Sequence, residues 1–525
     1  MKEKNKLNTI LTPTFCIGGG ISLIIAIASM LAPEGLAYAM QVTQAILATV
    51  YGWFIQIVPV LSIGILVYLA ISDKYGNMII GGKNAKTEYS TFTWIGMLFT
   101  ASIGGGLVTF AVNEPLISYL SCPTSLDASS KMEAVNEAMM TSLYHWGSSV
   151  WGIFALAGIG AAYFVTHHNA RYLPGDSIIK AWPEKKWTHK IAILINSLAC
   201  VCAVAAVSAS IGFGVAQIGA GADYLIPLPE NGITIIPYIA LVILIVVTIL
   251  AVSTKTVGKG MSILSDWNMY LCIGILLFTV VFGPTRFIME SFVQNFGKYT
   301  SGFISRSFEM FTFGTDPSTP SFLVTWDVSN NMFWISWAPF MSIFIATISK
   351  GRTIRQFVIA TLIVPTLFIL LWMSTYGGMS LLNTIQGDGS IAEMMNVRPD
   401  MTFFMIIAQL PFAKLISILS LVLIMLFLAT TYTSTALALS RITDRNGRNI
   451  SNLRSIAWVG IMGGVAVSSL IASSLGGSNA IATIRAVGST VAYSYVFFLI
   501  MTNVAFLRRL FLDKKKCNVG IKEEI

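Results

Sequence analysis

Apolar residues fill long, nearly continuous stretches of this chain, and polar residues gather in the segments between them. Each stretch holds about 20 residues or more, which is enough to cross the roughly 30 Å hydrocarbon layer of a bilayer as an α-helix. The pattern predicts an all-α polytopic membrane protein with twelve transmembrane helices. We place them at 14–32, 47–72, 91–111, 142–166, 191–218, 232–254, 261–283, 321–349, 354–376, 411–440, 455–473 and 484–507.

The segments between these spans leave no room for a soluble domain. The longest polar connections are 112–141, 284–320 and 377–410. Within the second connection, apolar and polar residues alternate at helical spacing over 286–298. This pattern is typical of a short helix lying on the outer membrane surface. We expect the first span to remain in the mature protein, because no small-residue cleavage site follows it.

Charge is scarce and unevenly distributed. Hydrophobic residues make up 55% of the chain and charged residues 11%, with a formal net charge of +9. If both termini are cytoplasmic, only seven of the 33 lysines and arginines fall on the outer side: Lys131, Arg286, Lys298, Arg306, Arg398, Lys414 and Arg485. The positive-inside rule therefore predicts a plasma membrane protein with both termini in the cytoplasm. The same bias explains the net charge, so we expect no nucleic-acid partner.

Cysteine and histidine give no sign of catalysis or of a metal cluster. The six cysteines show no metal-ligand spacing, and most lie in or beside apolar spans. A membrane enzyme would need facing histidine or carboxylate clusters. We assign three of the four histidines to a cytoplasmic loop, and the set is His145, His167, His168 and His189. We expect neither an enzyme nor a bound cofactor.

Two spans contain residues that weaken a helix. The third carries SIGGGL at 102–107, where successive glycines permit unwinding and close approach of a ligand. The eighth carries Pro339, which lacks a backbone donor and frees a carbonyl. The two spans are five apart, as expected for two inverted five-helix repeats with a transporter's binding site between them. The alternative is tight helix packing at the glycines and a simple proline kink.

Aromatic residues gather in the middle of the eighth span, where an interfacial belt does not explain them. Trp334 and Trp337 lie about halfway along 321–349, with Phe333 and Phe340 beside them. Ordinary helix packing is the alternative interpretation.

A second aromatic group lies in the fourth span at Trp146, Trp151 and Phe154. If the two spans face each other, their rings enclose a cage, which binds quaternary ammonium groups through cation–π attraction. A carrier of simple cations is expected to place a carboxylate near the membrane midplane. The nearest acidic residues, Glu114, Asp266 and Asp327, fall near span ends, which favours a net-neutral zwitterion.

The tenth span carries a run of hydroxyls, Thr430, Thr431, Thr433, Ser434 and Thr435. Hydroxyl oxygens and freed carbonyls are suitable ligands for sodium, a hard cation. Alternatively, these hydroxyls hydrogen-bond to their own helix or to its neighbours.

Three segments resemble the betaine/choline/carnitine transporter family. They are GMLFTASIGGGLVTFAVNEPLISY (96–119), YHWGSSVWGIFALAGIGAAYF (144–164) and WISWAPFMSIFIATISKGRTIRQF (334–357), and the resemblance extends over about residues 50–440. It implies a LeuT-like secondary transporter, commonly trimeric. The implied organisation has a tail and two leading helices (1–90), two five-helix repeats (91–283 and 321–508), an outer segment between them (284–320) and a cytoplasmic tail (509–525).

The resemblance also implies the site residues. The substrate would bind at Trp146, Trp151, Phe154, Phe333, Trp334, Trp337, Met341, Gly104, Gly105 and Gly106. Sodium would bind at Ile103, Phe427, Thr430 and Thr431, with a second ion near Ser210 and Phe340. Asn331 replaces one aromatic residue of the family's box, and Thr433 replaces an aspartate common in sodium-coupled members.

We expect uptake of a trimethylammonium zwitterion, with glycine betaine favoured, coupled to sodium. Met341 stands where carnitine carriers have methionine, whereas Asn268 stands where sodium-independent carnitine exchangers have arginine. A carnitine/betaine-type exchanger and a choline transporter are the alternatives within the family. A solute sensor that does not transport is the alternative outside it.

Overall fold

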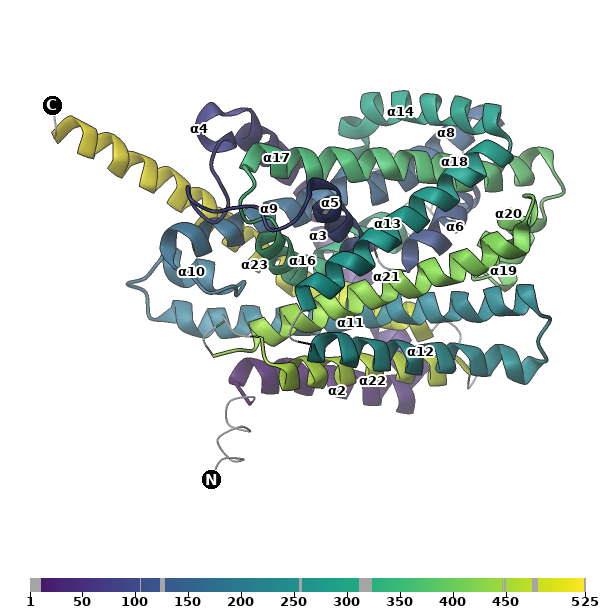
Figure 1. Cartoon of the computed structure of the whole chain (residues 1–525), viewed down its shortest axis with the longest axis horizontal. Helices are drawn as coiled ribbons and strands as arrows, with labels where there is room; N and C mark the ends of the chain where they lie inside the picture. Colours follow the sequence, from purple (N-terminus) through teal and green to yellow (C-terminus); the bar gives the residue numbers. More distant parts are fainter. Residues whose placement is uncertain are drawn as a thin grey trace.

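The computed structural model describes residues 11–523 except 104, 123–127, 255–256, 311–322, 446, 448–449 and 475–479. Gly104, part of the outer segment and the start of the predicted eighth span lie outside these residues. The described part of the chain contains 11 helices long and apolar enough to cross a membrane, or up to 12 if a bent pair counts as one span. Figure 1 shows a bundle of helices, and the length and apolar composition of these helices confirm the predicted all-helical membrane class.

The helices follow the predicted spans in order. In the first half they are α2 (Pro13–Leu31), α3 (Pro33–Ile71), α4 (Asp73–Gly76), α5 (Thr91–Ile103), α6 (Gly106–Ser121), α8 (Lys131–Trp146), α9 (Ser148–His168), α10 (Asp176–Ala181), α11 (Trp187–Leu225), α12 (Glu230–Ser253) and α13 (Val257–Phe282). In the second half they are α14 (Thr285–Ser307), the π-helix η1 (Leu323–Val328), α16 (Ser329–Ile348), α17 (Ile354–Val358), the π-helix η2 (Ile359–Ile363), α18 (Val364–Gln386), α19 (Ser390–Val397), α20 (Thr402–Ala408), α21 (Ala413–Ile442), α22 (Asn452–Ser474) and α23 (Ala480–Glu523).

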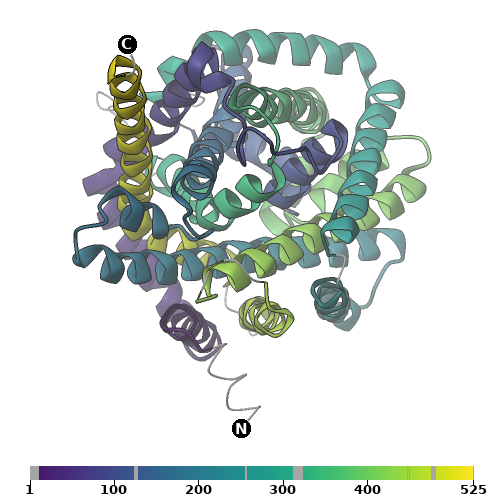
Figure 2. The ribbon, with the colours of Figure 1, turned by 60° about the vertical axis from the view of Figure 1, so that its left-hand side comes forward.

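Burial separates central helices from peripheral ones. In the most apolar window of α16, 94% of the residues are buried inside the protein, against 28% in the corresponding window of α12. Figure 2 shows α2, α12 and α22 along one side of the bundle, and α2 and α12 carry many exposed apolar side chains. Since α16 packs against α9, α11 and α23, its aromatic residues lie in the protein core and not against lipid.

Several predicted ends are wrong, chiefly where polar residues continue a helix. The connection predicted at 112–141 is largely helical, because α6 runs to Ser121 and α8 begins at Lys131. The connection at 377–410 contains the end of α18 together with α19 and α20. The helix predicted at 286–298 is confirmed as part of the longer α14, which packs against α8 and α18.

The predicted interruptions are confirmed in one span and corrected in the other. The axes of α5 and α6 differ by 62°, so the third span is broken at its glycines. By contrast, α16 continues as an α-helix through Pro339, and the irregular part of that span is η1 at its beginning. The fourth span has a break that the sequence analysis missed, at Gly147 between α8 and α9.

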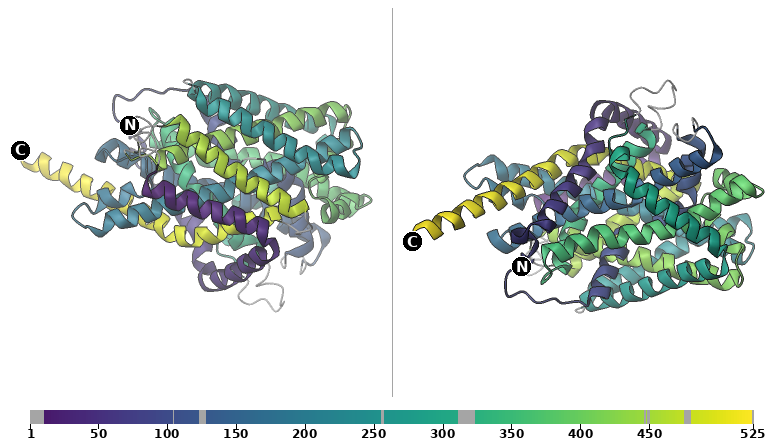
Figure 3. Two further views of the ribbon diagram at one scale, coloured as in Figure 1. Left: turned by 90° about the horizontal axis from the view of Figure 1, so that it is seen from below. Right: turned by 90° about the horizontal axis from the view of Figure 1, so that it is seen from above.

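The connections predicted to be cytoplasmic meet at one end of the bundle. The Gly351 amide donates to the Ile80 carbonyl over 2.8 Å, and the Arg171 guanidinium donates to the Arg445 carbonyl over 2.8 Å. The C-terminal part of α23 projects from the bundle at this end (Figure 3). These contacts are those expected for alternating spans, and the compartment that this end faces stays a prediction.

Candidate functional site

The aromatic residues of α16 form one continuous cluster. The ring centroids of Trp334 and Trp337 are 5.8 Å apart, and Phe333 lies 5.4 Å from Trp334. Trp337 in turn lies 5.4 Å from Phe340. Because residues three and four apart share a helix face, the sequence spacing itself brings these rings together.

The opposite wall comes from the break between α8 and α9. Gly147 occupies the break, where a Cβ would overlap the hydroxyl of Tyr299 from α14. That hydroxyl accepts a hydrogen bond from the Ser148 amide over 2.8 Å. The absence of a side chain at Gly147 thus lets α14 satisfy a donor freed at the break. Trp146, the last residue of α8, is fixed at this point.

The two walls meet edge to face, which fulfils the condition that the sequence analysis set for a cage between spans 4 and 8. The ring centroids of Trp146 and Trp334 are 5.2 Å apart at 80°, and those of Phe154 and Trp334 are 6.2 Å apart at 76°. Trp151 lies 6.3 Å from Phe154 and stacks on Phe99 of α5, which the sequence analysis did not single out. All six predicted aromatic residues therefore belong to one buried cluster, which we call the aromatic box.

Of the two glycines of this segment that the structure describes, Gly106 approaches the box. A Cβ on Gly106 would lie 3.5 Å from the Trp146 ring, whereas one on Gly105 would lie 3.0 Å from Leu428 and 3.2 Å from Gly214. Gly106 thus faces the box and Gly105 provides close packing against α21 and α11. Met341 and Ser102 bring α16 and α5 together, since the Ser102 hydroxyl lies 3.8 Å from the Met341 sulfur. Gly104 lies outside the described residues.

A buried charged chain borders the box, and here the sequence interpretation needs correction. Glu114 lies inside α6 and not at a span end, and its Oε2 accepts the Trp146 indole N–H over 2.5 Å. Its Oε1 lies 2.5 Å from Nδ1 of His145, whose Nε2 lies 2.7 Å from Asp327. The Arg306 guanidinium donates to the other oxygen of Asp327 over 2.7 Å. We name Glu114, His145, Asp327 and Arg306 the charged chain.

All four members of the charged chain are buried, so the premise of a site without a nearby carboxylate is wrong. The sequence did contain the signal: ionisable residues within apolar spans are functional candidates by default. The sequence analysis places Glu114 and Asp327 near span ends and gives His145 no role in the site. Glu114 is buried because α6 continues beyond the predicted end of the third span, whereas His145 in α8 and Asp327 in η1 lie within the predicted fourth and eighth spans.

The predicted ion ligands of α21 point toward α5. The hydroxyls of Thr430 and Thr431 each lie 3.3 Å from the Thr100 carbonyl, and the Thr430 hydroxyl also lies 3.0 Å from the Leu426 and Phe427 carbonyls of its own helix. The acceptor on α5 is thus Thr100, one turn before the predicted Ile103, which is buried nearby. Ser434 and Thr435 instead bond the Thr431 carbonyl of their own helix, as the alternative predicted.

Other residues that the sequence analysis connects with ion coupling carry buried polar groups that lack a hydrogen-bond partner among the described residues. The hydroxyls of Ser210 and Thr433 and both side-chain polar atoms of Asn268 have no hydrogen-bond partner within the described part of the chain. Phe340 packs against Trp337, and no hydrogen bond between described residues joins the Ser210 hydroxyl to α16. The second sodium site therefore stays a prediction.

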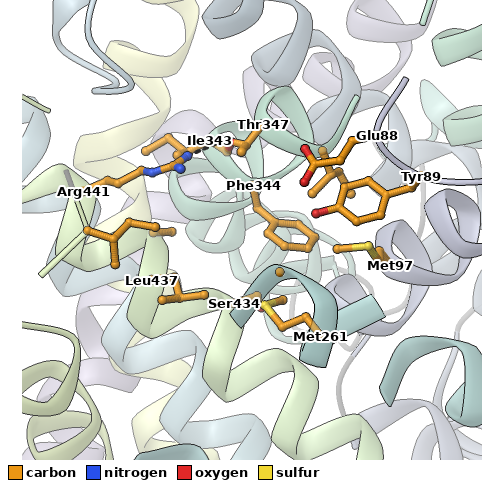
Figure 4. Close-up of a pocket in the computed structure, with 14 residues that line it drawn as sticks. Glu88, Tyr89, Met97, Met261, Ile343, Phe344, Thr347, Ser434, Leu437 and Arg441 are labelled. Atoms are coloured by element: carbon orange, nitrogen blue, oxygen red, sulfur yellow. Dashed lines mark hydrogen bonds between the residues drawn. The ribbon is translucent and has the colours of Figure 1, made fainter. Parts of the chain in front are cut away.

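A cavity of about 260 Å³ lies beyond the box, toward the end where the predicted cytoplasmic connections meet. Figure 4 shows Phe344 and Thr347 of α16 facing Ser434 and Leu437 of α21 across it, with Arg441 at one side. The Arg441 guanidinium donates to the Thr347 hydroxyl over 2.6 Å. Since Ser434 is one turn from Thr430, the cavity reaches toward the hydroxyls of Thr430 and Thr431, which we call the hydroxyl cluster.

Comparisons with known proteins assign the chain to a family. Residues 13–515 match the family model described as BCCT, betaine/carnitine/choline family transporter. The chain is 30% identical over 506 residues to the osmo-dependent choline transporter BetT2 of Acinetobacter baylyi, covering 95% of this chain and 71% of that protein. It is also 30% identical over 509 residues to the ectoine/hydroxyectoine transporter of Virgibacillus pantothenticus, covering 97% and 98%. Identity to the glycine betaine transporter OpuD of Bacillus subtilis is 30% over 449 residues, covering 85% of each chain. The chain therefore belongs to the BCCT family, which makes it a multi-pass membrane transporter and not an enzyme.

Proposed function

We propose that this protein takes up a trimethylammonium zwitterion, with glycine betaine favoured, by sodium-coupled secondary transport across the plasma membrane. The observation that carries the proposal is the aromatic box, in which Trp146 from α8 and Trp334 and Trp337 from α16 meet in the protein core. A methylated ammonium has no N–H group to donate, so ring faces suit it better than hydrogen-bond acceptors do.

The carboxylate end of a zwitterion has a matching partner in α6. This helix begins at Gly106, beside Trp146, and no side chain caps it. The free amides and the positive end of the helix dipole favour a negative group at this position. Both oxygens of Glu114 are already bonded to His145 and Trp146, so this carboxylate is not available to a cationic ligand. These features support a net-neutral solute.

Sodium coupling is supported by the convergence of two hydroxyls on one carbonyl. Thr430, Thr431 and the Thr100 carbonyl bring three oxygens together beside the break in the third span. An ion held there would tie α21 to α5 and order the segment that leads into Gly106. The cavity in Figure 4 then provides a route toward the predicted cytoplasmic side. We further propose a homotrimer with both termini in the cytoplasm.

Choline is the second candidate, because relatives named as choline transporters align along almost the whole chain. The relative named for glycine betaine is similar to the same degree, at 30% identity. Substrate choice within the family therefore rests on the box and on the start of α6. Carnitine is supported by Met341 alone.

Uptake into proteoliposomes tests the proposal. Radiolabelled glycine betaine is supplied with and without an inward sodium gradient, and excess choline or carnitine is added as competitor. We expect sodium-driven accumulation that unlabelled glycine betaine blocks best. Uptake that ignores the gradient and rises when carnitine is preloaded inside would instead identify an exchanger, and accumulation of choline alone would replace the proposed substrate.

A further inference from the structure

The hydrogen bonds of the charged chain beside the box require one proton more than a neutral His145 supplies. A neutral imidazole has one N–H donor and one lone pair, and a carboxylate only accepts hydrogen bonds. In the structure both ring nitrogens of His145 lie at hydrogen-bond distance from carboxylate oxygens, 2.5 Å from Glu114 and 2.7 Å from Asp327. Each contact needs a proton between its two atoms, and a neutral ring between two carboxylates supplies only one.

Turning the ring over does not remove this requirement. A flipped imidazole would place carbon atoms opposite both carboxylates and satisfy neither. The second proton is therefore taken from solvent, and the triad holds it between a ring nitrogen and a carboxyl oxygen. Its loss would set a nitrogen lone pair against a buried carboxylate oxygen, which is repulsive at this distance.

The surrounding charges allow this proton to bind reversibly. Among the described residues, and apart from His145 itself, the charged groups at the chain are two carboxylates and two guanidinium groups, on Arg306 of α14 and Arg485 of α23. These four charges balance one another, so the extra proton adds a net positive charge. Tyr144 of α8 and Cys122 after α6 are further titratable side chains there. Hydrogen bonding favours the bound proton and charge balance opposes it, which is the condition for reversible binding.

Glu114 connects this proton to the aromatic box. Its two oxygens are divided between His145 and the indole N–H of Trp146, and that indole lies edge to face with Trp334. Repulsion at His145 would displace the carboxylate that holds Trp146. By reciprocity of linked equilibria, a solute that needs Trp146 in place would bind with uptake of a proton.

We propose that the Glu114–His145–Asp327 triad is a proton-binding site linked to solute binding in the aromatic box through Trp146. The proposal rests on the proposed function, because it assumes that the box binds the solute. It adds a proton to the coupling scheme and assigns Glu114 as a positioning residue for Trp146. His168, which pairs with Asp513 over 2.8 Å near the end of α9, has no such connection and provides a matched comparison.

Substitution of Glu114 by glutamine offers a sharp test. In Glu114→Gln the amide oxygen can accept from Trp146 while the amide N–H donates to the lone pair of a neutral His145, so no extra proton is needed. Binding of glycine betaine to the purified protein is measured by tryptophan fluorescence between about pH 5.5 and 8.5, the range in which histidine ordinarily titrates. Proton uptake on adding solute is measured in parallel with a pH dye in weak buffer.

For the wild type we expect the Kd to rise with pH, approaching about tenfold per unit once the triad has lost its proton. We also expect uptake of up to about one proton per protein on binding. Glu114→Gln should bind with an affinity independent of pH, and His168→Gln should keep the wild-type profile.

A wild-type Kd that does not change with pH, without proton uptake, would overturn the inference and leave the proposed function intact. Loss of the pH dependence of the Kd in His168→Gln would also overturn the inference. The proton-uptake measurement needs no variant, so the test survives if Glu114→Gln does not fold. Absence of binding of both glycine betaine and choline at every pH would overturn the proposed function and the inference with it.

Discussion

The two walls of the aromatic box are held in different ways. On one wall, Trp146 lies at the broken junction of α8 and α9 and donates its indole N–H to buried Glu114. On the other wall, Trp334 and Trp337 lie in the unbroken helix α16, and their indole N–H groups have no hydrogen-bond partner within the described residues. Polar contacts fix the first wall, whereas ring packing fixes the second.

This difference separates two tasks within one site. Packed rings on a continuous helix provide a constant apolar surface for the methyl groups of a solute. A ring anchored to a charged chain moves when the charges change, because buried charges depend strongly on their partners. We therefore expect α16 to determine affinity and the α8 side to respond to ions and pH. The following changes would break or sharpen that comparison.

The largest effect should follow from Glu114→Ala, which removes the partner of both His145 and Trp146. Breaking a buried charge network by deleting one member costs about 3–5 kcal/mol, so the melting temperature should fall strongly. The control is Glu290→Ala, because Glu290 pairs with Arg286 on the exposed face of α14. This variant should melt close to the wild type. Equal melting temperatures for the two variants would show that the charged chain does not hold the α8 wall.

Trp334→Ala should come next, with its effect on binding. Loss of one well-placed ring costs about 2 kcal/mol, or about a 30-fold rise in the Kd for glycine betaine. Trp334→Phe keeps an aromatic face and should lose less. Trp458→Phe changes a buried tryptophan on α22 outside the box and serves as the control in the same equilibrium binding assay. Wild-type affinity in Trp334→Ala would remove α16 from the solute site.

A smaller effect is expected at the hydroxyl cluster. Replacing Thr430 and Thr431 together by valine removes two oxygens that converge on Thr100, and should raise the sodium concentration for half-maximal uptake about tenfold. Thr435→Val is the matched control, because its hydroxyl bonds its own helix. An unchanged sodium response in the double variant would place the coupling ion elsewhere.

The smallest effects should distinguish Gly105 from Gly106 at the break in the third span. A Cβ on Gly105 would lie 3.0 Å from Leu428 and 3.2 Å from the Gly214 Cα, so Gly105→Ala should cost about 1 kcal/mol of stability through overpacking. A Cβ on Gly106 meets only ordinary contact with Trp146 at 3.5 Å. Gly106→Ala should thus leave the melting temperature nearly unchanged and alter solute affinity a few-fold. The reverse pattern would assign Gly105 to the box.

The sequence predicted the spans and the aromatic box because both depend on local spacing. Stretches of apolar residues mark helices that cross a bilayer, and the positions 334 and 337 define one helix face. The second aromatic group in the fourth span was also visible in the sequence, and family resemblance then assigned both groups to one substrate site. The break at Gly147 was not predictable in the same way, because the Ser148 amide at the break finds its acceptor, the Tyr299 hydroxyl, on a helix remote in sequence.

The charged chain was missed for a related physical reason. Asn113 and Glu114 resemble the end of an apolar span, yet both are satisfied by partners remote in sequence. The Asn113 amide donates to the Pro399 carbonyl over 2.8 Å and accepts from Thr402 over 2.7 Å, while Glu114 bonds His145 and Trp146. Polar groups with such partners can be buried, so the helix continues beyond the apolar stretch.

The central claim is that the aromatic box holds the quaternary ammonium group of the solute. A cryo-electron microscopy structure of the protein at saturating glycine betaine and sodium tests it most directly. The account predicts density for the solute among Trp146, Trp334 and Trp337, with the methylated nitrogen within about 6 Å of the ring centroids. Solute density confined to the cavity between α16 and α21, with the box rings in mutual contact and no solute between them, would contradict it.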